Sequence, residues 1–251
     1  MSDDKKMTLL AHLLELKSRL IKSVIALAIT TVISFVFAKQ IFAVLIRPAG
    51  GINLIYIEVT EMLSTYMKVS LASGFILAMP YLVYHFLMFV SPALISKEKK
   101  YVYLVLPWIG LMFISGVIFA YFILVPPAMK FLVTFGSDIA TPQIKIGNYI
   151  SVVTRLLLAV GLVFELPVIT TFLARIGVIS SRWLASKRKG AIIFAFLLSA
   201  IITPTMDPIN QTLVAAPLIV LYEMSIWLAK LVQKKEIREV TSSLITQDQK
   251  S

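Results

Sequence analysis

Cysteine is absent from the 251-residue sequence, so neither disulfide bonds nor cysteine metal ligands can contribute to its structure. Charged residues are scarce at 15%, against about 25% in a soluble domain. Hydrophobic residues make up 59% and give a mean hydropathy of +0.89. They come in blocks of about twenty, the length that crosses the hydrocarbon core of a bilayer. The composition predicts a single polytopic membrane domain.

The motifs of several protein classes are also missing. The sequence has no His-Glu-x-x-His, no Gly-x-Ser-x-Gly and no glycine-rich phosphate loop, and its two histidines are His12 and His85. These gaps argue against an enzyme, and no cofactor or metal is expected. The net charge of +11 comes from residues placed in the gaps between apolar blocks rather than from a basic fold, so no nucleic-acid partner is expected.

Six apolar blocks predict six transmembrane helices, because a backbone in lipid must satisfy its own hydrogen bonds. The predicted spans are about 20–38, 63–90, 104–125, 150–174, 190–203 and 210–229. The fold class is therefore all-α, with residues 1–230 as one membrane domain and 231–251 as a polar tail. The fifth apolar run, Ala191 to Ile202, is roughly 18 Å of helix at about 1.5 Å per residue. It is expected to form a short hairpin with the sixth span.

The loops differ sharply in positive charge. The two tails and the loops 91–103 and 175–190 together hold 18 lysines and arginines, against 4 in the opposite loops. The positive-inside rule then predicts that both termini are cytoplasmic. No cleavable signal peptide is visible, so the first apolar block is expected to be a retained span.

The N-terminal stretch 8–22 is amphipathic. Glu15 and Arg19 share one face with His12, while a different face carries leucines at 4-3-4 spacing (Leu9, Leu13, Leu16 and Leu20). Such a helix is expected to lie at the membrane interface before the first span begins. Spacing alone also allows Glu15 and Arg19 to be an ordinary surface ion pair.

Glu165 lies about midway along the fourth predicted span. A carboxylate there costs several kcal/mol unless it is protonated, paired or hydrated, so an intramembrane acid indicates a functional site. Arg155 is ten residues away and off the same face, which makes it a poor partner within the helix. Each predicted span with an internal proline could bend there, either for packing or as a hinge (Pro80, Pro107, Pro167 and Pro217).

Four segments in order along the chain resemble motifs of the TatC family. They are His-Leu-Leu-Glu-Leu-Lys-Ser-Arg-Leu at 12–20, Phe89-x-x-Pro92-Ala93-Leu94 followed by Glu98-Lys99, Phe164-Glu165-Leu166-Pro167, and Thr203-Pro204 with Asp207, Gln211-Thr212, Pro217 and Glu223. The resemblance runs from about residue 8 to 230. Two departures are Lys17, where the family usually has arginine, and a turn at 203–208 that is one residue longer than usual.

The resemblance implies a receptor that binds twin-arginine signal peptides of folded precursor proteins in the bacterial inner membrane. It further implies a concave, glove-like arrangement of six helices, TatA- and TatB-type single-span partners, homo- and hetero-oligomers, and transport driven by the proton-motive force. The signal-peptide contacts it implies are His12, Glu15, Leu16, Lys17, Arg19, Phe89, Pro92, Leu94 and Glu98. It places Glu165 as an intramembrane polar group and Thr203, Asp207 and Gln211 at a partner contact.

Alternatives remain open at this stage. Thr203 and Gln211 could simply hydrogen-bond within their own hairpin. A secondary transporter with Glu165 as a proton relay would show a repeat relation between its halves, and the sequence shows no internal repeat.

Overall fold

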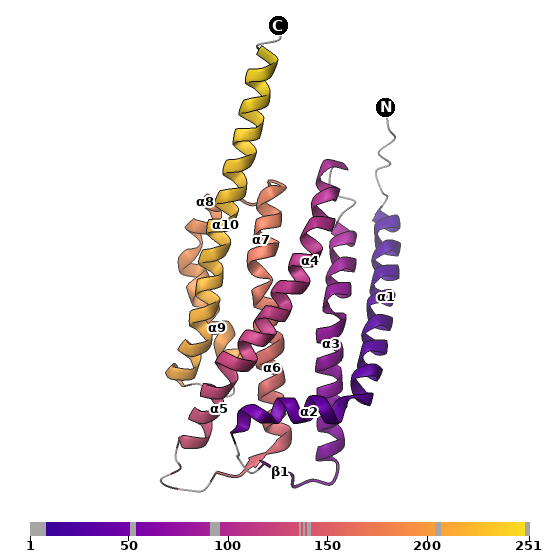
Figure 1. Ribbon diagram of the computed structural model, residues 1–251, viewed down its shortest axis with the longest axis vertical. Coiled ribbons are helices and arrows are strands. Elements are labelled where there is room, and N and C mark those ends of the chain that lie inside the picture. The colour runs from indigo at the N-terminus through magenta and orange to yellow at the C-terminus, as the bar shows by residue number, and fades with distance from the viewer. Residues whose placement is uncertain are drawn as a thin grey trace.

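Long helices run side by side through the molecule (Figure 1). The computed structural model describes residues 9–50, 54–90, 96–135, 137, 139, 142–203 and 207–248, and places side chains for residues 13–89, 105–203 and 207–233 within these ranges. Neighbouring helices pack in turn across the bundle: α1 on α3, α3 on α4 and α6, and α7 and α9 on α10. The helix that begins the chain and the helix that ends it reach the same end of the bundle (Figure 1).

The first half of the chain contains, in order, α1 (Leu9–Val36), α2 (Ala38–Ile46), η1 (Arg47–Ala49), β1 (Leu54–Ile55), α3 (Glu61–Val90), α4 (Ser96–Phe119), the π-helical η3 (Ala120–Leu124) and α5 (Val125–Thr134). The second half contains β2 (Ile144–Lys145), α6 (Ile146–Phe164), α7 (Leu166–Arg175), α8 (Ser181–Ser186), α9 (Arg188–Ile202) and α10 (Pro208–Asp248). Helix is therefore the dominant structure, which confirms the all-α prediction, and the two strands contain two residues each.

Five helical stretches of the described chain are long and apolar enough to cross a membrane. They are Leu13–Val36, Glu61–Phe89, Val105–Thr134, Ile146–Arg175 and Pro208–Gln233. Each contains or overlaps a span predicted from the sequence. The remaining prediction, at 190–203, corresponds to α9, which has 15 residues and packs along α10. The fifth predicted span, which forms the short first arm of the hairpin, is thus a helix.

Two features were not predicted from the sequence. Helix α10 continues without a break through the predicted polar tail to Asp248. The loop expected after the first span contains α2, which lies across the end of the bundle (Figure 1).

Helix α2 is held by residues that are remote in the sequence. The hydroxyl of Tyr121 donates to the carbonyl of Val44 at 2.7 Å, and that of Tyr149 donates to the carbonyl of Leu45 at 2.9 Å. The last carbonyls of a helix lack full helical partners, and these tyrosines bond there from elsewhere in the fold; the carbonyl of Val44 also accepts from the backbone N–H of Arg47. Phe42 also stacks on Tyr66, with ring centroids 5.1 Å apart.

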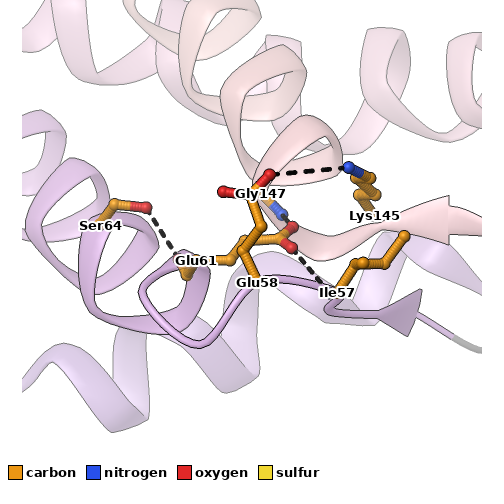
Figure 2. Close-up of polar contacts among 6 residues, drawn as sticks. All are labelled: Ile57, Glu58, Glu61, Ser64, Lys145 and Gly147. Atoms are coloured by element: carbon orange, nitrogen blue, oxygen red, sulfur yellow. Dashed lines mark hydrogen bonds and ion pairs between the residues drawn. The ribbon is translucent and has the colours of Figure 1, made fainter.

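A polar clasp joins the start of α3 to the start of α6 (Figure 2). The carboxylate of Glu61 accepts from the backbone N–H of Ile57 at 3.0 Å and from that of Gly147 at 3.1 Å. Gly147 lies in the first turn of α6, where N–H groups lack helical partners and an anion is favoured. Beside it, β1 pairs in parallel with β2, and Lys145 lies 4.0 Å from Glu58.

Glycines let helices touch closely at two crossings. A Cβ atom added to Gly116 of α4 would lie 2.7 Å from Cγ of Phe164 and 3.0 Å from Cα of Gly161, both on α6. One added to Gly74 of α3 would lie 2.7 Å from Cα of Thr31 on α1. Small residues are how membrane helices gain close van der Waals contact, because lipid provides no hydrophobic drive for their association.

We expect Gly116→Ala to lower the free energy of unfolding by about 1–3 kcal/mol, because the methyl group must push α4 away from α6. Gly190→Ala is the matched control, since a Cβ at Gly190 of α9 meets no atom within 4 Å. The control should be neutral or slightly stabilising. Thermal unfolding in detergent measures both variants, and equal midpoints for the two would contradict the proposed crossing.

Candidate functional site

The residues singled out from the sequence fall into three places. One set lies in the first half of α1 and at the adjoining ends of α3 and α4, a second is at the junction of α6 with α7, and the third is in the hairpin of α9 and α10. The start of α1, the end of α3 and the start of α4 are at the same end of the bundle (Figure 1). The fold thus brings Glu15 and Phe89, which are 74 residues apart in the sequence, to the same end of the bundle.

On α1 the predicted pair of Glu15 and Arg19 is formed. The guanidinium of Arg19 donates from Nε to Oε1 of Glu15 at 2.8 Å, and its Nη2 bonds to the same oxygen. The other oxygen, Oε2, is shielded from solvent and has no partner among the described residues. Leu16 and Lys17 on the same helix are exposed. One half of the Glu15 carboxylate is therefore engaged, and the other half has an unused acceptor.

The rest of the first set is described only in part. Phe89 is half-buried in the last turn of α3. Pro92 and Leu94 lie outside the described residues, as do the side chains of His12 and Glu98, although their backbones belong to α1 and α4.

Glu165 occupies a break in the fourth span. It separates α6 from α7, because Pro167 has no N–H to donate to the carbonyl four residues earlier. The side chain is only 2% exposed, and neither carboxyl oxygen has a hydrogen-bond partner among the described residues. Arg155, which its position in the sequence already makes a poor partner for Glu165, forms no ion pair with it. The structure places an unpaired acid at a backbone discontinuity.

Glu165 lines an apolar cavity of about 540 Å³ between α3, α4 and the α6–α7 segment. The other lining residues are Phe75, Met79, Leu82, Val83, Phe86, Leu87, Val105, Ile109, Leu162, Ile169, Phe172 and Leu173. A carboxyl group in such surroundings has no local means of offsetting its lost hydration. It is suited to accept a hydrogen bond or a positive group that a docking segment brings with it.

The polar residues of the α9–α10 hairpin bond within the chain. The hydroxyl of Thr203 donates to the carbonyl of Ser199 at 2.8 Å, and Nε2 of Gln211 donates to that of Phe196 at 2.9 Å. The carboxylate of Asp207 accepts from the N–H of Asn210 at 2.7 Å and caps the start of α10. The alternative of bonding inside the hairpin is thus observed for Thr203 and Gln211.

Two polar groups in the helices were not assigned from the sequence. Glu223 of α10 forms a two-pronged ion pair with Arg188 at the start of α9, with N–O distances of 2.6 and 2.9 Å. The two lie 35 residues apart, so periodicity could not reveal the pair. His85 of α3 is 7% exposed and has no hydrogen-bond partner for either ring nitrogen among the described residues. The only signal in the sequence was a histidine within an apolar span.

Replacing Glu165 with leucine should stabilise the isolated protein. The substitution removes an unpartnered carboxyl group from an apolar cavity without breaking a bond, and we expect a gain of about 1–3 kcal/mol. Glu223→Leu is the comparison variant. It leaves Arg188 without its ion-pair partner, so it should not raise the stability of the protein. Thermal unfolding in detergent compares the two, and a lower midpoint for Glu165→Leu would mean that Glu165 supports the fold.

Residues 11–217 match the TatC family, described as Sec-independent protein translocase protein (TatC). The TatC protein of Aquifex aeolicus is 45% identical over 241 residues, which cover 93% of this chain and 100% of that protein. The TatC protein of Carboxydothermus hydrogenoformans is 40% identical over 236 residues, covering 93% and 97%.

A crystal structure described as the twin arginine translocase receptor TatC superposes with a TM-score of 0.80 at 44% identity. The superposition covers 88% of this chain and 99% of the other. The same fold and the same sequence family thus extend over nearly the whole of both molecules, and this chain belongs to the TatC family of Sec-independent protein translocase proteins.

Proposed function

We propose that this chain is the receptor subunit of a twin-arginine translocase, which binds twin-arginine signal peptides of folded precursors. The observation that carries the proposal is the nearly full-length likeness, at 44% identity, to a structure described as that receptor. The relatives are translocase proteins rather than enzymes, in keeping with the missing catalytic motifs. On this proposal the chain works with TatA- and TatB-type single-span subunits and draws on the proton-motive force.

The proposed location is the bacterial inner membrane, with both termini in the cytoplasm. The excess of 18 to 4 in lysine and arginine between the two sets of loops supports this orientation. The end of the bundle at which α1 begins and α10 ends is then cytoplasmic, and the end with α2 and the clasp faces the periplasm. A signal peptide arriving from the cytoplasm would meet Glu15 first.

Recognition of two arginines calls for carboxylates at fixed positions, because bidentate bonds between guanidinium and carboxylate are geometrically selective. Glu15 already binds one guanidinium, that of Arg19, through its Oε1 alone, which supports a role for this carboxylate in binding arginine. Its Oε2 accepts no bond among the described residues and is shielded from solvent, so an incoming arginine would reach this second acceptor once the Glu15 side chain turns. Glu98, near the start of α4 at the same end of the bundle, is the proposed second acid. Phe89 would contact the hydrophobic segment of the signal peptide.

We expect Glu15→Ala and Glu98→Ala each to weaken binding of a twin-arginine peptide by about 1–3 kcal/mol, the contribution of a lost charge-assisted bond. The double variant should lose less than the sum if both acids contact the same arginine pair. Peptide affinity for the purified chain measures this, with Glu58→Ala at the far end of the bundle as control.

Peptide affinity, measured together with export of a reporter protein, separates recognition from transport. Glu165→Gln should keep peptide affinity and reduce export of a twin-arginine reporter, because Glu165 is buried in the cavity and separate from Glu15 and Glu98. Unchanged affinity in both acid-to-alanine variants would remove Glu15 and Glu98 from the proposed site.

The hairpin of α9 and α10 is the proposed docking place for a partner helix. Its outer surface on α9 is apolar and exposed (Ile193, Phe194, Leu197 and Ile201). Thr203, Asp207 and Gln211 would lie at the edge of this contact. The bond from Gln211 to Phe196 uses one side-chain N–H, which leaves the other amide groups of Gln211 to meet a partner.

Disulfide scanning is direct in this chain, because it has no native cysteine. Cysteines at Ile193 and Leu197 should crosslink to a single cysteine in a TatA- or TatB-type helix, whereas the exposed control Val32 on α1, at the opposite edge of the bundle, should not. Gln211→Leu should weaken the association by about 0.6–2 kcal/mol, the contribution of one polar contact in lipid. Absence of crosslinks along α9 would end this assignment.

A further inference from the structure

A groove separates α1 from α3 near the end of the bundle at which α1 begins. The two helices are antiparallel neighbours (Figure 1) and touch backbone to backbone where Gly74 meets Thr31. From that contact towards the start of α1 they diverge and leave a cavity of about 380 Å³. The residues that line it are Lys22, Ile25, Ala26, Ile29 and Thr30 of α1, and Leu77, Ala78 and Tyr81 of α3.

We call the end of the groove at Thr30, next to the Gly74 crossing, its closed end, and the end at Lys22 and Tyr81 its open end. Its lining on α1 runs from Thr30, next to the Gly74 crossing, to Lys22, which is roughly 12 Å of helix at about 1.5 Å per residue. Small side chains, Ala26 and Ala78, keep it hollow. A slot of this length, with apolar walls, suits a flexible chain such as an acyl tail.

Polarity changes along the groove. Ile25, Ile29 and Leu77 are exposed apolar walls, while Lys22 and Tyr81 bring a cation and a hydroxyl to the open end. Lys22 forms no ion pair with any acid among the residues whose side chains are described. An apolar slot that ends in an unpaired ammonium group complements an amphiphile with an anionic head.

Tyr81, at the open end of the groove, packs against a second aromatic ring of α3. The ring of His85, one turn further along α3, packs edge-to-face on Tyr81 with centroids 4.4 Å apart. Both nitrogens of this buried histidine lack hydrogen-bond partners among the described residues. The open end of the groove thus combines the ammonium of Lys22, which forms no ion pair among the described side chains, with the hydroxyl of Tyr81 and the unpartnered ring nitrogens of His85 close by.

We propose that this groove binds an anionic phospholipid of the surrounding leaflet. One acyl chain lies between Ile25, Ile29 and Leu77, and the phosphate contacts the ammonium of Lys22 and the hydroxyl of Tyr81. Lipid is the medium around these helices, and basic pockets between transmembrane helices on the cytoplasmic side bind anionic headgroups. The lipid would brace α1, which carries Glu15 less than two turns from Lys22 and packs mainly on α3.

Native mass spectrometry of the full chain in detergent tests the headgroup contact. With added phosphatidylglycerol we expect a bound lipid that phosphatidylcholine does not replace, and about fivefold weaker binding in Lys22→Gln, the effect of one cation near a membrane surface. Lys17→Gln is the control, since Lys17 is exposed on the same helix and does not line the groove. Equal binding by Lys22→Gln and the unchanged chain would overturn the proposal.

The acyl slot is tested separately. Ala26→Phe should block the groove and release the lipid, whereas Ala28→Phe, an exposed position of α1 outside the groove, should not. A phosphatidylglycerol with a photoreactive acyl chain, used on the unchanged chain, should crosslink to Ile25, Ile29 or Leu77. Crosslinks confined to other helices, or equal loss in the two phenylalanine variants, would mean that only bulk lipid contacts α1.

Discussion

The close crossing of α4 and α6 at Gly116 and Gly161 is the contact on which the central part of the structure depends. Without side chains at these two positions, Phe113 packs against Gly161 and Phe164 against Gly116. In lipid such packing is what holds helices together, because their apolar surfaces gain nothing by leaving a medium that is equally apolar. The crossing fixes α6 against α4 next to Glu165, and thereby brings that residue to the cavity that α3 and α4 also line.

The other end of α6 is fixed by different chemistry. There the carboxylate of Glu61 caps the helix at Gly147, and Tyr149 bonds to the carbonyl of Leu45 at the end of α2. Polar bonds form at this end because α3 and α6 begin here, and the first N–H groups of a helix need acceptors from outside it. Between these two fixed points the buried face of α6 forms the core (Ile150, Val153, Leu156 and Val160). The break at Glu165 is therefore set on a rigid support.

The sequence was sufficient for the features that depend on local chemistry. The lengths of the apolar blocks in the sequence predict the spans, because the thickness of the bilayer sets the length of a helix that crosses it. The four-residue spacing of Glu15 and Arg19 predicts their ion pair, and the short run before Thr203 predicts a short helix. The acid at residue 165 was recognised because charge is costly at that depth.

Features that depend on distant partners were missed. The nine residues of α2 include Lys39 and Gln40 and are too few to span a bilayer, and the helix is fixed by Tyr121 and Tyr149, which are 77 and 104 residues from their acceptors. The pair of Arg188 and Glu223 and the cavity at Glu165 likewise exist only once helices are packed. Pro167 was noted, but its effect, a one-residue interruption of the helix at Glu165 within a single span, required the tertiary structure.

The contrast between α6 and α1 assigns different roles to the two helices. Helix α6 is enclosed by α3, α4 and the ends of α2 and α9, so the groups it carries are held in one geometry. Helix α1 packs mainly on α3, and most of its apolar side chains are exposed to the surroundings. Its position near Glu15 is therefore set mainly by its packing on α3, which is tightest at Gly74, and by whatever fills the groove between the two helices. On the proposal that Glu15 binds a substrate arginine beside Arg19, such a support would be an advantage, because small movements of α1 would admit the second guanidinium while α6 keeps Glu165 in place.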